Sequence, residues 1–196
     1  MLDLENALFD EETDGIIPVP PGNYPAHITD VKIRTFDSGS TVYNLTFKVA
    51  PEVSNQTVPK LSMNGDGTPT ASTDKDGNAL TINGAFLSGK EFRLDNGMWL
   101  TPSPAKGEGW KNRRYTEWCE SLGLEFKKNK DGKKKLGQAE EDDLLGRGCT
   151  IQLKEVAWEN KDTGQSGKAM KAVSLSNWDK SYNLSSDELA VDDLPF

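Results

Sequence analysis

Residues 22–50 constrain the fold more than any other part of the chain, because their side chains alternate between apolar and polar. Every second residue from Tyr43 to Val49 is large and apolar. A period of two is typical of a β-strand that buries one face. The sequence therefore predicts a long hairpin with strands over residues 24–35 and 41–50.

The alternation in the first of these strands slips by one residue at Asp30 and then resumes. A slip of this kind indicates a β-bulge, which a strongly bent strand requires. Asn96-Gly97 is a strong signal for a tight turn between two strands. Further short strands are predicted over residues 80–87, 90–95, 97–101, 148–158 and 169–176.

One segment has a helical period. Tyr115, Trp118 and Leu122 fall on one face of a helix predicted over residues 110–122, and the glycine that follows is a typical helix stop. Residues 54–79 are rich in small, polar and turn-forming residues and predict a long mobile loop. We expect a mostly β fold, a five-stranded Greek-key barrel of the OB type with one α-helix and long loops. A Greek-key sandwich is the alternative.

Two acidic arms flank a mildly basic centre. The formal net charge is −8, yet residues 1–15 hold six acidic side chains and no basic one, whereas residues 106–135 hold ten basic and five acidic ones. Such a centre suits a polyanionic ligand, while solubility alone is the plainer interpretation. We expect an acidic flexible arm over residues 1–17, a folded domain over residues 18–178 and an acidic disordered tail over residues 179–196.

The counts of reactive residues exclude several classes of function. One histidine, His27, and two cysteines, Cys119 and Cys149, are too few for a Cys/His zinc site. We expect buried thiols, a surface histidine, no metal, no cofactor and no catalytic activity. No apolar run is long enough for a membrane span, and the acidic N-terminus is unlike a secretory signal. The run Glu140–Asp143 offers ligands for a metal-dependent nuclease, although a solvated loop is the simpler interpretation.

The chain ends in a compact epitope. The ring and terminal carboxylate of Phe196 suit an apolar pocket rimmed by Arg or Lys, and neighbouring aspartates add electrostatic steering. This terminus resembles the acidic tip of single-stranded DNA-binding proteins, which implies that it recruits replication or recombination proteins. A disordered acidic end without a partner is the alternative. The tip consists of Asp192, Asp193, Leu194, Pro195 and Phe196.

A second resemblance covers much of residues 20–178. Three short patterns occur in the order found in phage-encoded single-stranded DNA-binding proteins with an OB fold. They are Gly22-x-Tyr24-x-Ala26-x-Ile28, Leu122-Gly123-Leu124 and Leu144-Leu145-Gly146-Arg147. The resemblance implies a protein that coats exposed single strands during phage DNA replication and recombination in the cytoplasm of an infected bacterial host. It leaves the oligomeric state open, with a homodimer among the alternatives.

Binding to single strands without sequence preference combines base stacking on aromatic rings with a basic groove for the backbone. Tyr24, Tyr43, Phe47, Tyr115 and Trp118 lie on predicted inward faces and are assigned to the core. The remaining aromatic and basic candidates lie on outward faces, at strand ends or at the helix start. The predicted nucleic-acid-binding residues are Lys32, Arg34, Lys48, Arg93, Trp99, Trp110, Lys111, Arg113, Arg114, Lys154, Trp158, Lys168 and Lys171.

The sequence thus predicts a non-catalytic protein that binds and protects single-stranded DNA and recruits partners through its C-terminal tip. Two hypotheses from other classes stay open. One is a β-rich virion or adaptor protein that has no nucleic-acid ligand, and the other is the metal-dependent nuclease.

Overall fold

The computed structural model describes residues 17–65, 67–102, 104–126, 130, 137–160 and 163–178. The predicted C-terminal tail and nearly all of the predicted N-terminal arm lie outside the described residues. The described chain forms two compact units. The smaller unit comprises residues 17–20 and 57–82, and the larger comprises residues 21–56 and 83–178.

The predicted hairpin is confirmed and organises the larger unit. Strand β1 (Gly22–Thr35) pairs with the antiparallel strand β2 (Thr41–Val49). The pairing register shifts between Ile28 and Asp30, where the sequence predicts a bulge. Before this shift, β1 also pairs with β9 (Gly148–Glu159) on its other side. The bend therefore lets one strand pair with β2 along most of its length and with β9 along its first half.

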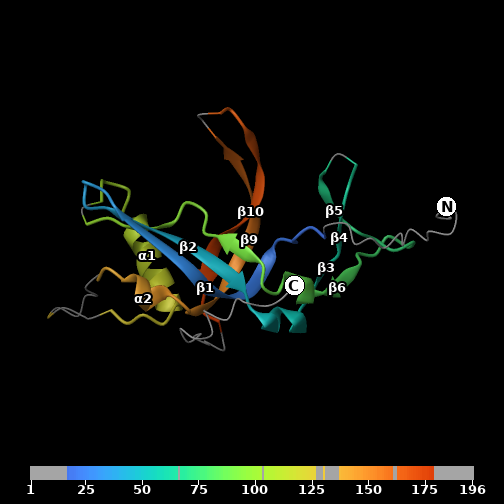
Figure 1. The fold of residues 1–196 in the computed structure, drawn as a ribbon, viewed down its shortest axis with the longest axis horizontal. Helices are drawn as coiled ribbons and strands as arrows, with labels where there is room; N and C mark the ends of the chain where they lie inside the picture. The colour runs from blue at the N-terminus through green and yellow to red at the C-terminus, as the bar shows by residue number, and fades with distance from the viewer. Residues whose placement is uncertain are drawn as a thin grey trace, which may run out of the picture. The chain divides into compact units, whose positions relative to one another are not determined.

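Six strands of the larger unit form one sheet. Its main order is β10-β9-β1-β2-β7, with β7 at Glu91–Arg93 and β10 at Ser166–Ser176, and β8 (Met98–Leu100) also pairs with β2. Asn96 and Gly97 both have positive φ, 59° and 67°, which confirms the predicted tight turn between β7 and β8. Figure 1 shows β9 and β10 continuing past the other strands as a two-stranded arm.

The two edges of this sheet meet at one point without forming a closed barrel. Leu94 forms a single parallel bridge with Ala172 of β10, and the Asp95 N–H donates to the Ala172 carbonyl over 2.8 Å. The expected mostly β class is confirmed. The expected five strands are six in this sheet, because the segment after β2 is broken by the tight turn into β7 and β8.

Helix α1 (Trp110–Ser121) confirms the predicted helix and covers part of the sheet. It buries Tyr115, Trp118 and Cys119 and ends at Gly123, whose φ of +74° allows the terminal N–H groups to cap the last turn. The Tyr115 hydroxyl donates to the Gly137 carbonyl and accepts from the Ala139 N–H, so the helix also holds the segment before β9.

Three expectations about local structure are wrong. Residues 54–79 do not form a long loop, because they contain a hairpin over residues 61–71, an antiparallel bridge between Thr73 and Ala79, and one strand of a second two-stranded sheet. Glu140–Asp143 is exposed to solvent as expected, but it is not a loop, because it contributes to a short helix, α2 (Glu141–Leu144), with a reciprocal cap between Glu140 and Asp143. The strands of the smaller unit are β3 (Thr57–Pro59), β4 (Leu61–Met63), β5 (Pro69–Ala71) and β6 (Thr81–Asn83). Short 3-10 helices flank them at Pro51–Asn55 and Gly84–Leu87.

His27 is the third wrong expectation. It lies on the polar side of β1, as its place in the alternation predicts, but it is buried at 4% exposure. The ring of Trp178 lies edge-on against it, with ring centroids 5.2 Å apart. The segment after β10 therefore covers an outward-facing histidine that the strand pattern alone leaves at the surface.

The predicted core aromatics are buried. Tyr24, Tyr43, Phe47, Tyr115 and Trp118 are each at most 4% exposed. Burial raises the pKa of Tyr24 to about 12, so its hydroxyl stays neutral at physiological pH. These rings belong to the core formed by β1, β2 and α1. Because they are buried, they are not available to stack on a ligand.

The close approach at Gly97 gives a test of the fold. A Cβ at this position would lie 2.7 Å from Val42 Cγ2 and would hold a positive φ. Gly97→Ala should therefore lower the free energy of unfolding by about 1–2 kcal/mol for the backbone and roughly 1–3 kcal/mol more for the clash. Gly107→Ala, also at positive φ but with nothing within 4 Å, is the matched control and should lose only the backbone term. Urea denaturation measures both, and equal losses would contradict the close packing.

Candidate nucleic-acid interface

Five predicted binding residues share the outer face of β1, β2, β7 and β8. Residues paired across neighbouring antiparallel strands point to the same side of a sheet. Arg34, Val42 and Trp99 form one such row, because Val42 pairs with both of the others. The other rows on this face place Lys32 opposite Asn44, Thr46 opposite Arg93 and Lys48 opposite Glu91. The register thus places Lys32, Arg34, Lys48, Arg93 and Trp99 on one face of the sheet.

At one end of this face, two cations and three aromatic rings contact one another in a row that we call the ladder. It consists of Arg34, Phe36, Trp99, Lys111 and Trp110. The Arg34 guanidinium lies 4.7 Å from the Phe36 ring centroid, and Phe36 stacks on Trp99 at 5.6 Å and 15°. The Lys111 ammonium lies 5.8 Å from the Trp99 ring and 6.0 Å from the Trp110 ring. Each contact falls within the range of stacking or cation–π attraction.

Four parts of the fold build the ladder, and the first is β1, which supplies Arg34. The turn after β1 supplies Phe36, whose N–H donates to the Ser40 carbonyl while its own carbonyl accepts from Gly39. Strand β8 supplies Trp99, and the first turn of α1 supplies the last two members. The Trp99 indole N–H donates to the Asn96 carbonyl over 2.7 Å, which fixes its ring. The ladder therefore depends on tertiary structure and not on one sequence segment.

The rings of the ladder differ in exposure. Trp99 is only partly exposed and contacts both Phe36 and Lys111, whereas Trp110 is 52% exposed. A planar ligand can therefore stack on Trp110 without displacing another ring. The sequence predictions missed Phe36, and its position two residues after Arg34, at the tip of the predicted hairpin, is the signal that could have found it.

The arm formed by β9 and β10 carries a second group of predicted residues. Trp158 is 40% exposed and lies across the strand over Gly167, where a Cβ would come within 3.0 Å of the indole. Lys154 pairs with Lys171 on the same face as Trp158, while Lys168 pairs with Ala157 on the opposite face. The arm therefore groups Lys154, Trp158 and Lys171 and separates them from Lys168.

Several predicted cations already contact carboxylates. Lys32 lies 3.3 Å from Asp30, and Lys111 lies 2.8 Å from Glu108. Sequence reasoning missed these pairs, although the Glu108–Lys111 spacing of three residues at a helix start is a visible signal. Two further pairs join Lys168 to Glu155 at 2.9 Å and Lys171 to Asp95 at 3.1 Å.

The two arginines of α1 have different surroundings. Arg114 donates from Nη2 to the Val173 carbonyl over 2.5 Å, and its guanidinium lies 4.2 Å from the Trp118 ring centroid. The first contact joins the helix to β10, and the second lies within the helix, so both engage the Arg114 guanidinium in the fold. Arg113 is exposed on the same helix and is open to a ligand.

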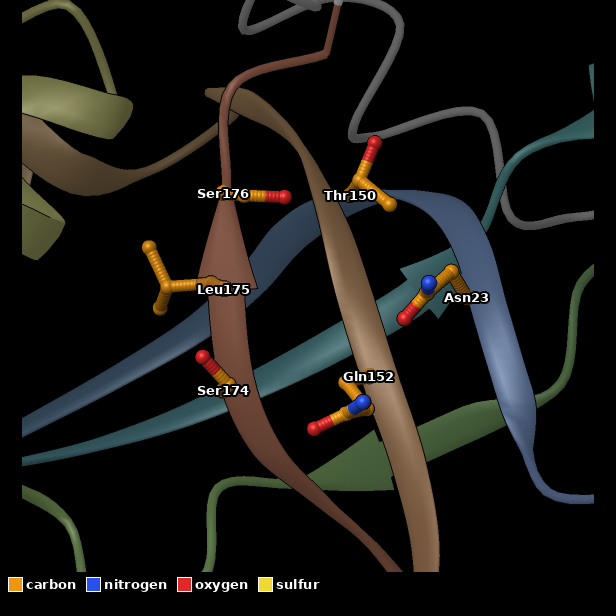
Figure 2. Close-up of a pocket in the computed structure, with 6 residues that line it drawn as sticks. All are labelled: Asn23, Thr150, Gln152, Ser174, Leu175 and Ser176. Carbon is orange, nitrogen blue, oxygen red and sulfur yellow. The ribbon is translucent and has the colours of Figure 1, made fainter.

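A shallow hollow of about 180 Å³ lies on the outer face of β1, β9 and β10. Figure 2 shows its lining side chains on these three neighbouring strands. Asn23, Gln152 and Ser174 form one row across the strands, and Thr150 pairs with Ser176 beside it. These side chains are uncharged hydrogen-bonding groups, and sequence reasoning did not single them out.

Other chemistry has little support in the described part of the chain. Burial raises the pKa of both Cys119 and Cys149 to about 12, so neither thiol is a ready nucleophile at neutral pH. Within the described ranges, no group of three or more His, Cys, Asp or Glu side chains is placed to hold a metal ion. The described helices include none with the length and apolar character to cross a membrane.

The predicted partner-binding tip, from Asp192 to Phe196, lies outside the described residues, so its conformation adds nothing to this site. A comparison with known protein families and with curated proteins gives no match to this chain. The functional argument therefore rests on the sequence and on the geometry above.

The division of the tryptophans can be tested through stability. Trp118 is 4% exposed and packed under Arg114, so Trp118→Ala should lower the free energy of unfolding by about 3–5 kcal/mol. Trp110→Ala removes a half-exposed ring and should cost less than about 1 kcal/mol. Urea denaturation followed by circular dichroism compares the two variants with the unmodified protein. Similar losses would mean that Trp110 is also a core residue and unsuited to a ligand.

Proposed function

We propose that this protein binds single-stranded DNA, without strong sequence preference, on the outer face of β1, β2, β7 and β8. The observation that carries the proposal is the ladder. It combines cations, which attract phosphates, with an exposed indole, on which a base can stack. Bases in a duplex are already stacked on one another, so an exposed ring of this kind favours unpaired strands.

We further propose that the larger unit is an OB-type barrel of the partly open kind. Its strand order, the bend that β1 makes between two hairpins, and the helix before β9 support this assignment. The parallel bridge between Leu94 and Ala172 is the contact at which such a barrel would close. Oligonucleotides bind OB folds along the second and third strands and the loops beside them. The corresponding region here carries Arg34, Phe36 and Trp99.

The alternatives receive less support. Glu140 and Asp143, which would serve a nuclease, are engaged in capping a short helix. A virion or adaptor protein without a nucleic-acid ligand would have no need for an ordered stack of cations and rings at its surface. The uncharged hollow in Figure 2 suits a partner of some kind but does not favour either alternative.

The acidic C-terminal tip extends the proposal to partners. We propose that Phe196 and the aspartates before it recruit replication or recombination proteins, as the resemblance to single-stranded DNA-binding proteins implies. The setting that fits both parts is phage DNA replication and recombination in the cytoplasm of an infected bacterial host.

Binding of a labelled oligothymidine, followed by fluorescence anisotropy, tests the central proposal. If about four to six phosphates are neutralised, the logarithm of the binding constant should fall against the logarithm of salt concentration with a slope of about −3 to −4. Trp110→Ala should weaken binding by about 1–3 kcal/mol, because one stacked base is lost. Trp110→Phe keeps an aromatic face and is the control. Absence of binding at low salt would overturn the proposal, and a strong preference for one short sequence would contradict base tolerance.

Deletion of residues 188–196 tests the role of the tail. This segment is acidic and tethered to the binding domain, so it should compete with DNA at a millimolar effective concentration. The truncated protein should bind oligothymidine more tightly, most visibly at low salt, and should lose its replication partners. Phe196→Ala should lose the partners but keep DNA affinity, because the charges remain. Unchanged DNA affinity together with unchanged partner recovery in pull-downs would contradict both roles.

A further inference from the structure

A further inference concerns the regulation of the proposed DNA-binding site, and it rests on the proposed function. Lys32, Lys111, Lys168 and Lys171 each lie within 3.3 Å of a carboxylate oxygen of their own chain. A phosphate that approaches such a lysine meets an ion pair and not a free cation. The pair that belongs to the ladder is Lys111 with Glu108, and this lysine also contacts the indole rings of Trp99 and Trp110.

Glu108 and Lys111 are held together by two contacts. Their side chains meet at 2.8 Å, and the Lys111 backbone N–H donates to the Glu108 carbonyl over 3.0 Å. The Lys111 side chain is only 25% exposed, whereas that of Glu108 is 44% exposed. The carboxylate is therefore more exposed to solvent than the ammonium, which also contacts Trp99 and Trp110.

This arrangement gives the carboxylate and a DNA phosphate the same binding partner. Both are anions with oxygen acceptors, and both form charge-assisted hydrogen bonds with an ammonium. The carboxylate lies three residues before Lys111, in the segment that leads into α1, so it does not have to be recruited from solution. We propose that Glu108 is a built-in competitor for DNA phosphate at Lys111, which lowers the affinity of the ladder for single strands.

The competition has a measurable signature in the salt dependence. While Lys111 is neutralised by Glu108, it contributes little to the number of phosphates that the protein neutralises. Glu108→Gln keeps the size of the side chain but removes its charge, so Lys111 becomes available to one more phosphate. The slope against salt should steepen by about 0.7, which is the contribution of one phosphate on a single strand. The gain in affinity is therefore largest at low salt and shrinks as salt rises.

In the opposite role, Glu108 is a positioning residue that orients the Lys111 ammonium for contact with a DNA phosphate. The two roles predict opposite signs. If Glu108 positions the lysine, removing its charge weakens DNA binding. If it competes, the same change tightens binding, and the effect disappears when Lys111 is also replaced.

The test uses the full chain and a labelled oligothymidine over a range of salt concentrations. Glu108→Gln should bind about two- to fivefold more tightly at low salt, as expected for one partly exposed ion pair. Glu117→Gln removes the same charge from an exposed position of α1 and should change affinity much less. In a Lys111→Gln background, Glu108→Gln should have no effect. Thermal unfolding checks that each variant is folded, and Glu108→Ala provides a second variant.

Three results would overturn the inference while leaving the proposed function intact. They are an unchanged or weaker Glu108→Gln complex, an equal effect of Glu117→Gln, and a Glu108→Gln effect that persists without Lys111. If the unmodified protein does not bind oligothymidine at any salt concentration, the proposed function fails and this inference fails with it.

Discussion

The bulge in β1 is the constraint on which the larger unit depends. At Ile28 the strand ends its pairing with β9 and continues to pair with β2, and its backbone bonds there go to the segment before β9. The Ile28 N–H donates to the Arg147 carbonyl over 3.0 Å, and the Ile28 carbonyl accepts from the Gly146 N–H over 2.8 Å. Arg147 in turn donates from its guanidinium to the Leu122 carbonyl at the end of α1. A single irregular residue pair therefore links both hairpins and the main helix.

The ladder is a consequence of this framework. The second half of β1 sets the position of Arg34 and of the turn that carries Phe36, while β2 holds β8 and with it Trp99. The helix is fixed by Tyr115 from within and by Arg114 against β10. Its first turn then brings Trp110 and the neighbouring lysine to the same surface. The folded structure thus places every member of the ladder. The conformational entropy of these side chains is therefore lost on folding, and little more is lost when a ligand binds.

The sequence predicts the regular parts of this protein well, because hydrophobic periodicity reports directly on which side chains are buried. It finds the hairpin, the bulge at Asp30, the Asn96-Gly97 turn, the helix and its stop at Gly123. It does not find contacts made by irregular segments. Trp178 covers His27 from outside the strand pattern, and a hairpin and a further strand form within a stretch whose composition is that of a loop. Ion pairs such as Asp95 with Lys171 depend on tertiary contacts between segments far apart in the chain, which periodicity does not encode.

Residues 57–82 are inserted into the larger unit, and the chain segments on either side of this insertion are bonded to each other. The two ends are closed on each other by the Gly84 N–H, which donates to the Gln56 carbonyl over 2.9 Å, and by the Asn83 amide, which donates to the Ser54 carbonyl over 2.6 Å. Gly84 packs so tightly that a Cβ would lie 2.6 Å from the Val53 carbonyl oxygen. An insertion whose two ends are bonded in this way tolerates a change in its length, because the cost of bringing the ends together rises only slowly with length. Residues 57–82 are therefore where we expect insertions and deletions to cost the larger unit little stability, and where a grafted reporter domain should be tolerated.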